Sequence, residues 1–259
     1  MTRWFWLLVF ILAGCGGTPT TQQASEQAVS QQASNSEVRH RAKVHAELGA
    51  LYLQDGRFGV ALEEAKIATT ADPSYAPGFN LMALVHMYLQ ERGPAEENFQ
   101  KALRLAPNDP EVNNNYGWFL CTTDREKQGI EHFMVAVKNP LYTTPAKPLT
   151  NAGLCYLKQK DDRNAEEFLV RSLRLDVNNP QALYALSEIY YRGGRLREAR
   201  VRLGDLHKIT EPNAQSTWLA LLVERRLGDR EAEARHAVQL RRRFQGSPEY
   251  DKLMQGRYE

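Results

Sequence analysis

The sequence has few of the residues that build catalytic or metal sites. Its 259 residues include three cysteines, at positions 15, 121 and 155, and that spacing fits no metal-ligand cluster. His40 and His45 are five residues apart, not the four that place a metal-binding pair on one helix face. No phosphate-binding loop and no Gly-x-Ser-x-Gly motif occurs. We therefore expect no catalytic residue, no metal and no cofactor, and a protein that is not an enzyme.

A strong excess of one charge sign is also absent. Lysine and arginine total 33 and aspartate and glutamate total 31, a formal net charge of +2. Proteins that bind nucleic acid through its phosphates carry a marked basic excess. The composition therefore disfavours a nucleic-acid partner.

The N-terminal apolar run is too short to span a bilayer. It covers Trp4–Ala13, follows Arg3, and ends in Leu-Ala-Gly-Cys at residues 12–15. This tetrapeptide resembles the lipobox of bacterial lipoproteins, which implies cleavage before Cys15 and lipidation of its sulfur. Gly16, in place of the aspartate that marks inner-membrane retention, favours the outer membrane, facing the periplasm. The alternative is a plain secretory signal with a chance cysteine.

The next segment is polar and nearly uncharged. Residues 15–37 are rich in glycine, serine, threonine and glutamine, so they cannot bury enough apolar surface to fold. We predict a signal peptide at 1–14 and a lipidated flexible tether at 15–37.

A repeat organises the rest of the chain. Ala61, Ala65, Ala68 and Pro73 are followed, all at one common offset, by Ala95, Phe99, Ala102 and Pro107. The first three members lie on one helix face and the proline ends the helix. A helix–turn–helix unit that recurs every ~34 residues is the signature of the tetratricopeptide repeat. The sequence therefore predicts an all-α fold, an α-α superhelix of about six such repeats over 38–246.

The predicted repeats cover residues 42–75, 76–109, 110–143, 146–179, 180–213 and 214–246, followed by a tail at 247–259. Gly117 and Gly153 are separated by two residues more than the common offset, so we expect two inserted residues in a bulged loop near 139–145. Gly129 takes the place of the usual alanine and should weaken its helix. In the tail, Ser247 is placed to cap one helical turn.

In such a stack the first helix of each repeat lines the inner face. In repeats one to three this face gives a candidate partner-binding groove made of Ala46, Ala50, Leu53, Asn80, Leu84, Met87, Asn114 and Trp118. Asn80 and Asn114 offer donors and acceptors for a peptide backbone, and Leu84, Met87 and Trp118 offer apolar contacts. The alternative is that these side chains only pack against neighbouring helices.

Two charged features are expected to be mainly solvated. The acidic pairs Glu63–Glu64, Glu96–Glu97 and Glu166–Glu167 are assigned to the outer face of the second helices. The arginine run Arg241–Arg243 is either a solvated face or a contact for an acidic partner or lipid headgroups.

Together, four features resemble a known family. The stretch NNNYGWFLC (113–121), the lipobox, six repeats with an insertion after the third, and the ending FQGSPEY (244–250) are similar to the PilF/PilW family of type IV pilus biogenesis lipoproteins. The resemblance implies a pilotin, a monomer that binds the secretin subunit and supports its targeting to the outer membrane and its multimerisation. The alternative is a periplasmic scaffold lipoprotein for a cell-wall hydrolase or a barrel-assembly complex.

The two remaining cysteines form an even pair once Cys15 carries lipid. Cys121 and Cys155 fall on the first helices of repeats three and four, which are neighbours in the stack, in an oxidising compartment. We expect a disulfide closing a loop of about 34 residues. Two buried free thiols are the alternative.

Overall fold

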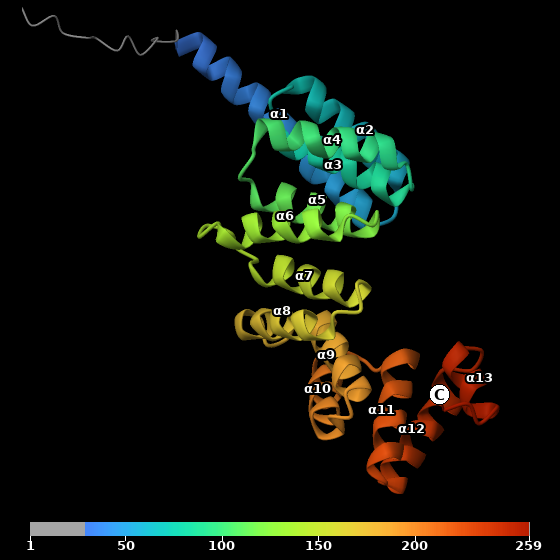
Figure 1. Cartoon of the computed structure of the whole chain (residues 1–259). Helices are drawn as coiled ribbons and strands as arrows, with labels where there is room; N and C mark the ends of the chain where they lie inside the picture. Colours follow the sequence, from blue (N-terminus) through green and yellow to red (C-terminus); the bar gives the residue numbers. More distant parts are fainter. Residues whose placement is uncertain (1–28, 259) are drawn as a thin grey trace, which may run out of the picture. The chain divides into compact units, whose positions relative to one another are not determined.

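The structure, a computed structural model, describes residues 29–258; the signal peptide and Cys15 lie outside this part. The described residues form helices and no strand, which confirms the all-α prediction (Figure 1). The helices are α1 (Val29–Gln54), α2 (Phe58–Ala71), α3 (Ala76–Tyr88), α4 (Arg92–Leu105), α5 (Pro110–Thr122), α6 (Glu126–Lys138), α7 (Ala146–Lys158), α8 (Asp162–Leu175), α9 (Pro180–Arg192), α10 (Leu196–Ile209), α11 (Ala214–Leu227), α12 (Arg230–Arg243) and α13 (Pro248–Met254). The contacts between residues divide the chain into two units, residues 1–37 and 38–259. The helix packing described below is that of the second unit.

Consecutive helices form pairs, and the pairs follow one another with a nearly constant period. The first helices of the pairs begin at residues 76, 110, 146, 180 and 214, so all intervals are equal except the one from 110 to 146, which is longer by two. The longer interval contains the connection 139–145 between α6 and α7. Within it Tyr142 is buried, and its hydroxyl donates to Glu111 of α5 at 2.9 Å. The inserted residues therefore form a loop that is fixed against the preceding pair.

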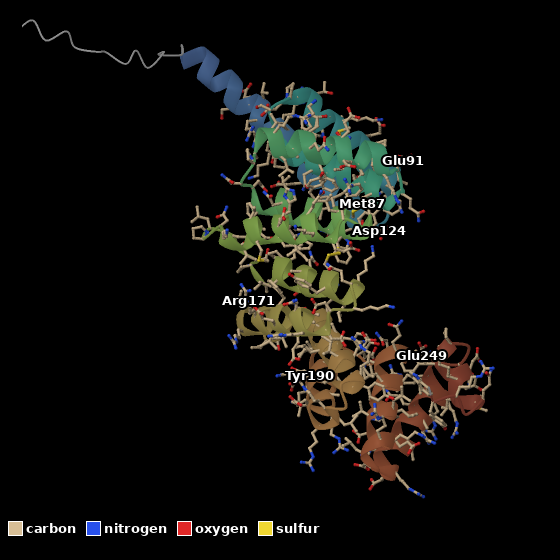
Figure 2. The ribbon with its side chains drawn as sticks, in the orientation of Figure 1. Met87, Glu91, Asp124, Arg171, Tyr190 and Glu249 are labelled. Atoms are coloured by element: carbon tan, nitrogen blue, oxygen red, sulfur yellow. A yellow bond between two sulfur atoms is a disulfide. The ribbon has the colours of Figure 1, made fainter. Side chains whose placement is uncertain are left out.

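The small residues of the repeat lie where two helices touch. Ala61, Ala65 and Ala68 of α2 are fully buried, as are their counterparts Ala95, Phe99 and Ala102 of α4. Side chains fill the space between successive helices along the stack (Figure 2). Because a helix pair cannot cover its own apolar stripe, each pair depends on its neighbours for burial.

The contact between α5 and α6 is closer still. A Cβ added to Gly129 would lie 2.6 Å from the carbonyl oxygen of Gly117, and one added to Gly117 would lie 2.8 Å from that of Gly129. The two backbones thus meet directly, without side chains between them. The expectation that Gly129 only weakens its helix is therefore incomplete, because an alanine does not fit there.

All three acidic pairs do more than face solvent. Glu64 of α2 lies 2.6 Å from Nδ1 of His45 on α1. Arg125, just before α6, donates to both carboxylate oxygens of Glu96 on α4. Arg195, just before α10, does the same to Glu166 on α8. The assignment to a merely solvated face was wrong for these three glutamates, and Glu96 and Glu166 each bind an arginine of the next pair. Hydrogen bonds from Arg125 lower the pKa of Glu96 against the opposing effect of burial. Since all four groups are partly exposed, each pair contributes only about 1 kcal/mol or less.

Helix α1 begins earlier than the predicted first repeat. It starts at Val29, so residues 29–37, predicted as the end of a flexible tether, are helical. This stretch contains glutamine, alanine and glutamate, which favour helix, and extending an existing helix avoids the cost of nucleation. No helix within 29–258 is both long and apolar enough to cross a membrane.

Helix α13 ends the stack as half a repeat. It begins at Pro248, one repeat period after the start of α11, where the first helix of a further repeat would begin, and Ser247 caps it by accepting from the amide of Tyr250. Leu253 of this helix is buried against α11 and α12. Figure 2 labels Glu249, in the first turn of the same helix. The short helix therefore covers the apolar end of the last complete pair.

The close contact of α5 with α6 makes a prediction about stability. Gly129→Ala should lower the free energy of unfolding by about 1–3 kcal/mol, since overpacking outweighs the gain in helix propensity. Gly204→Ala is the matched control: Gly204 lies inside α10 with nothing within 4 Å of an added Cβ, so it should gain about 1 kcal/mol. Urea unfolding measures both, and a stabilised Gly129→Ala protein would contradict the packing argument.

Candidate functional site

One groove runs along the inner face of the first helices. It encloses about 980 Å³ and is lined by residues of α1, α3, α5 and α7. The structure brings together all eight residues predicted to share it: Ala46, Ala50, Leu53, Asn80, Leu84, Met87, Asn114 and Trp118. Ala46 and Asn114 are buried in its floor, whereas the other six remain partly exposed.

The apolar part of the groove lies on α3 and α5. Leu84 and Met87, one turn apart on α3, are partly exposed and pack on the cluster around Phe99. Trp118 of α5 lines the same groove. At its edge Tyr88 is 58% exposed and stacks on another aromatic ring of the lining, 5.8 Å away. These side chains therefore offer apolar surface that a bound segment would cover.

The polar part of the floor is a chain of four asparagines from three helices. The amide of Asn151 donates to Asn114 at 2.9 Å, Asn114 donates to Asn115 at 3.1 Å, and Asn115 donates to Asn80 at 3.3 Å. Asn114 is 1% exposed and uses both ends of its carboxamide inside this chain. Its predicted role as a direct contact for a peptide backbone is therefore corrected: it supports the floor.

The ends of the asparagine chain keep unused groups. Among residues 29–258, Asn80 Nδ2 and Asn151 Oδ1 make no hydrogen bond, and both side chains are partly exposed. One end thus presents a donor and the other an acceptor. A peptide backbone carries both kinds of group, so these two residues suit an extended segment lying across the floor.

Sequence reasoning missed part of this lining. Asn115, Asn151 and Leu154 also line the groove, but the prediction stopped at the third repeat and considered fewer inner positions. Asn115 and Asn151 are separated by the longer interval that spans the insertion, and so are Trp118 and Leu154. Adding the two inserted residues to the repeat period leads from the predicted Trp118 to Leu154. The same longer spacing leads from Asn115 to Asn151.

The stretch 113–121 supports the groove from behind. Asn113 donates to the carbonyl oxygens of Pro107 and Asp109, which fixes the turn before α5. Its own oxygen accepts from Nδ1 of His132 on α6 at 2.8 Å, and burial lowers the pKa of His132. A neutral histidine that donates from Nδ1 satisfies this contact. The motif therefore ties the start of α5 both to its preceding turn and to its paired helix.

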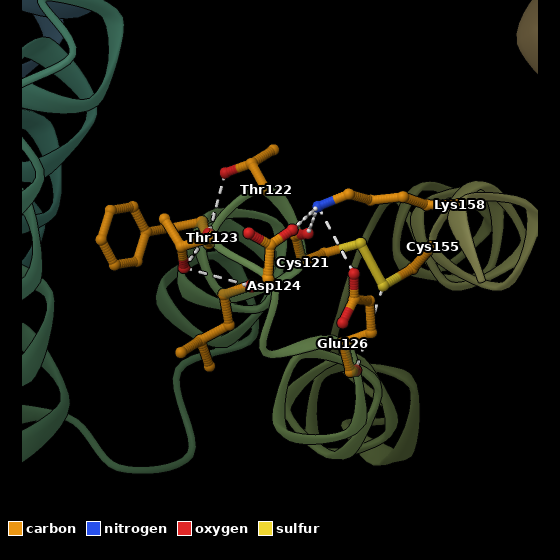
Figure 3. The surroundings of a disulfide bond; sticks show 9 residues. Cys121, Thr122, Thr123, Asp124, Glu126, Cys155 and Lys158 are labelled. Carbon is orange, nitrogen blue, oxygen red and sulfur yellow. Dashed lines mark hydrogen bonds and ion pairs between the residues drawn. A yellow bond between two sulfur atoms is a disulfide. The ribbon is translucent and has the colours of Figure 1, made fainter.

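The end of the same stretch joins two pairs covalently. Cys121 of α5 and Cys155 of α7 form a disulfide with their Cα atoms 5.9 Å apart, and both residues are buried. Beside it, the Lys158 ammonium donates to the Cys121 carbonyl at 2.8 Å and to Asp124 at 2.7 Å, and lies 3.4 Å from Glu126 (Figure 3). The disulfide and the lysine thus hold α7 against α5 and the turn that follows it.

The chemistry of the groove is that of a binding surface. Its lining combines apolar side chains and carboxamides with a few charged residues, among them Glu111 and Lys147, which form an ion pair at 2.9 Å. Within residues 29–258 no three histidine, cysteine or acidic side chains are grouped to hold a metal ion. Such an arrangement can bind a peptide segment by its backbone and its apolar side chains.

Comparison with known proteins places these features in context. A family model described as tetratricopeptide repeat matches residues 76–109 and 146–179. The chain is 29% identical over 246 residues to the type IV pilus assembly protein PilF of Pseudomonas aeruginosa, covering 95% of this chain and 96% of PilF. The crystal structure of PilW, described as a widely conserved type IV pilus biogenesis factor, is similar with a TM-score of 0.75 and 28% identity, over 82% of this chain and 98% of PilW. The structure of Pseudomonas aeruginosa PilF is similar with a TM-score of 0.77 and 28% identity, over 85% and 99%.

Removing the disulfide should lower stability strongly. Cys121 and Cys155 are 34 residues apart, and a loop of that length stabilises a protein by about 3–4 kcal/mol in the chain-entropy model. We expect Cys121→Ala/Cys155→Ala to lose at least that amount in urea unfolding. Wild-type protein unfolded with and without excess reductant is the control, and equal unfolding midpoints in the two conditions would contradict the expectation.

Proposed function

Because this chain is homologous to the type IV pilus biogenesis proteins PilF and PilW, we propose that it acts as a pilotin in that process. In this role it binds the secretin subunit, brings it to the outer membrane and supports its multimerisation. The homology supports the process; the groove is the single observation that supports binding. The groove encloses about 980 Å³, and six of its eight predicted lining residues remain partly exposed in the folded chain.

The groove suits a short segment of a partner protein. Leu84, Met87 and Trp118 lie on two adjacent first helices and provide apolar contacts where a partner side chain is shielded from water. Such central apolar and aromatic contacts usually carry most of the affinity of an interface. Beside them, Asn80 and Asn151 are available to the backbone of the segment.

The rigid floor lowers the cost of binding. Asn114 and Asn115 link α3, α5 and α7 through hydrogen bonds, and the disulfide Cys121–Cys155 joins α5 to α7. A surface that is already ordered loses little conformational entropy when a segment binds. We therefore expect the groove to have the same shape in the free and in the bound protein.

A pair of substitutions tests the groove. Trp118→Ala should weaken binding of the purified secretin subunit by about 2 kcal/mol, as expected for a central aromatic contact, with little change in helicity by circular dichroism. Leu84→Asp combined with Trp118→Ala should weaken it further, because a charge enters the apolar part. Val201→Ala on α10, which is exposed and outside the groove lining, is the control. Unchanged affinity of the double variant would exclude this groove.

The membrane anchor is a separate part of the proposal. Leu-Ala-Gly-Cys at residues 12–15 supports cleavage before Cys15 and lipidation of its sulfur, and several acyl chains give stable anchoring. The residues from 16 onward then link the anchor to the repeats in the periplasm. This arrangement would hold the groove close to the outer membrane, where the secretin is to assemble.

Mass spectrometry tests the anchor directly. The mature protein should begin at Cys15 with its sulfur and amine acylated, and Cys15→Ala should remove the lipid and release the protein from outer-membrane fractions. Cys121→Ala/Cys155→Ala keeps Cys15 and should stay in the membrane fraction. An unmodified Cys15 in protein isolated from its native cells would rule out the anchor.

A further inference from the structure

One acidic residue interrupts an otherwise apolar row on the inner face. The ninth residue of each first helix from α3 onward occupies the same place in the repeat; these residues are Leu84, Trp118, Leu154, Glu188 and Leu222. Leu84, Trp118 and Leu154 line the groove. Glu188, on α9, follows directly after Leu154 in this row and carries a carboxylate where the others carry apolar side chains.

Glu188 has no cationic partner within the part of the chain that the structure describes. It takes part in none of the ion pairs between residues 38 and 258. The nearest basic residue on its helix, Arg192, is already bound to both carboxylate oxygens of Asp162 at 2.7 and 3.2 Å. Glu188 is half-buried, and burial raises its pKa, although the charge of Arg192 and the hydroxyl of Tyr184 act in the opposite direction. A carboxylate in such a place is short of counter-charge.

An aromatic ring accompanies this carboxylate. Tyr184 lies one turn before Glu188 on the same face of α9, a spacing at which side chains meet. Burial, together with the nearby charge of Glu188, raises the pKa of the Tyr184 hydroxyl. The phenol therefore stays neutral, and a cation bound beside Glu188 would be favoured both by the carboxylate and by a neighbouring aromatic ring.

The groove leads toward this residue. Its lining reaches Asn151 and Leu154 on α7 and Gln181 in the first turn of α9, and α7 and α9 are in contact. A segment that lies on the apolar part and continues past Leu154 therefore arrives at the inner face of α9. There the next residue of the row is Glu188.

We propose that Glu188 is a specificity residue that receives a lysine or arginine side chain of the segment bound in the groove. The inference rests on the proposed role of the groove. An ammonium or guanidinium group would supply the missing counter-charge through charge-assisted hydrogen bonds, with Tyr184 against its aliphatic stem or its charge. The preferred segment thus contains apolar residues that contact Leu84 and Trp118, and a basic residue at the end of the segment that lies nearest α9.

The experiment uses two peptide sources and the mature protein, without the signal peptide at 1–14, purified in detergent. One source is a set of overlapping peptides covering the secretin subunit, and the other is a random peptide display library. Peptides selected by the wild-type protein should carry a lysine or arginine at a fixed distance from their apolar residues. In the tightest peptide, changing that residue to norleucine should weaken binding about tenfold to wild type and leave binding to Glu188→Gln nearly unchanged.

Matched variants separate recognition from folding. Glu188→Gln keeps the shape of the side chain, Glu188→Lys should reverse the preference toward acidic peptides, and Glu131→Gln changes an exposed glutamate of α6 and should change nothing. Thermal unfolding shows whether each variant is folded. The proposal is overturned if folded Glu188→Gln binds the basic and norleucine peptides with the same difference in affinity as wild type.

The two peptide sources also separate this inference from the proposed function. If no secretin peptide binds but library peptides show the basic residue and its dependence on Glu188, the secretin is not the partner while the specificity stands. If secretin peptides bind through Trp118 with no dependence on Glu188, the groove function stands and the specificity is wrong.

Discussion

The close approach of paired helices is the contact on which the rest of this protein depends. The helices approach closely at alanines of α2 and α4, and at Gly117 of α5 and Gly129 of α6. Larger side chains do not fit at these positions. Helices held this closely have little freedom to rotate, so each first helix turns the same positions toward the inner face. The groove is the sum of these repeated positions, and it exists only because several pairs stack in register.

The strongest internal links lie where the regular period is interrupted. The interval from α5 to α7 is longer than the others, and the added residues form the loop fixed by Tyr142. Across this junction run the disulfide, the contacts of Lys158 and the hydrogen bond from Asn151 to Asn114. Polar groups buried in a protein usually need partners close by, and here those partners come from neighbouring pairs. The asparagine chain consequently keeps three helices in register beneath the groove.

The inner face changes character along the stack. Leu84, Met87 and Trp118 make part of it apolar, Asn80 and Asn151 offer carboxamides, and α9 carries the half-buried Glu188. A uniform apolar surface would bind many segments weakly and would distinguish them poorly. Placing polar and charged groups at set positions favours one arrangement of partner groups and disfavours those that leave a buried charge unpaired. If a partner segment binds here as proposed, this pattern gives the physical basis for selecting it by a fold whose repeats are otherwise alike.

The sequence by itself determined the periodic properties: an all-α fold, the constant spacing of the repeats, the one longer interval and the set of inner-face positions. These properties follow from helical geometry and from small residues at fixed offsets. They can be predicted without knowing which distant residues touch. Only the tertiary structure decided what individual side chains do there. Asn114 was expected to face a partner, yet it is used up by Asn115 and Asn151; Glu96 was expected to be solvated, yet it binds Arg125. Whether a polar group is free depends on which helices stack beside it, and a local pattern does not contain that information.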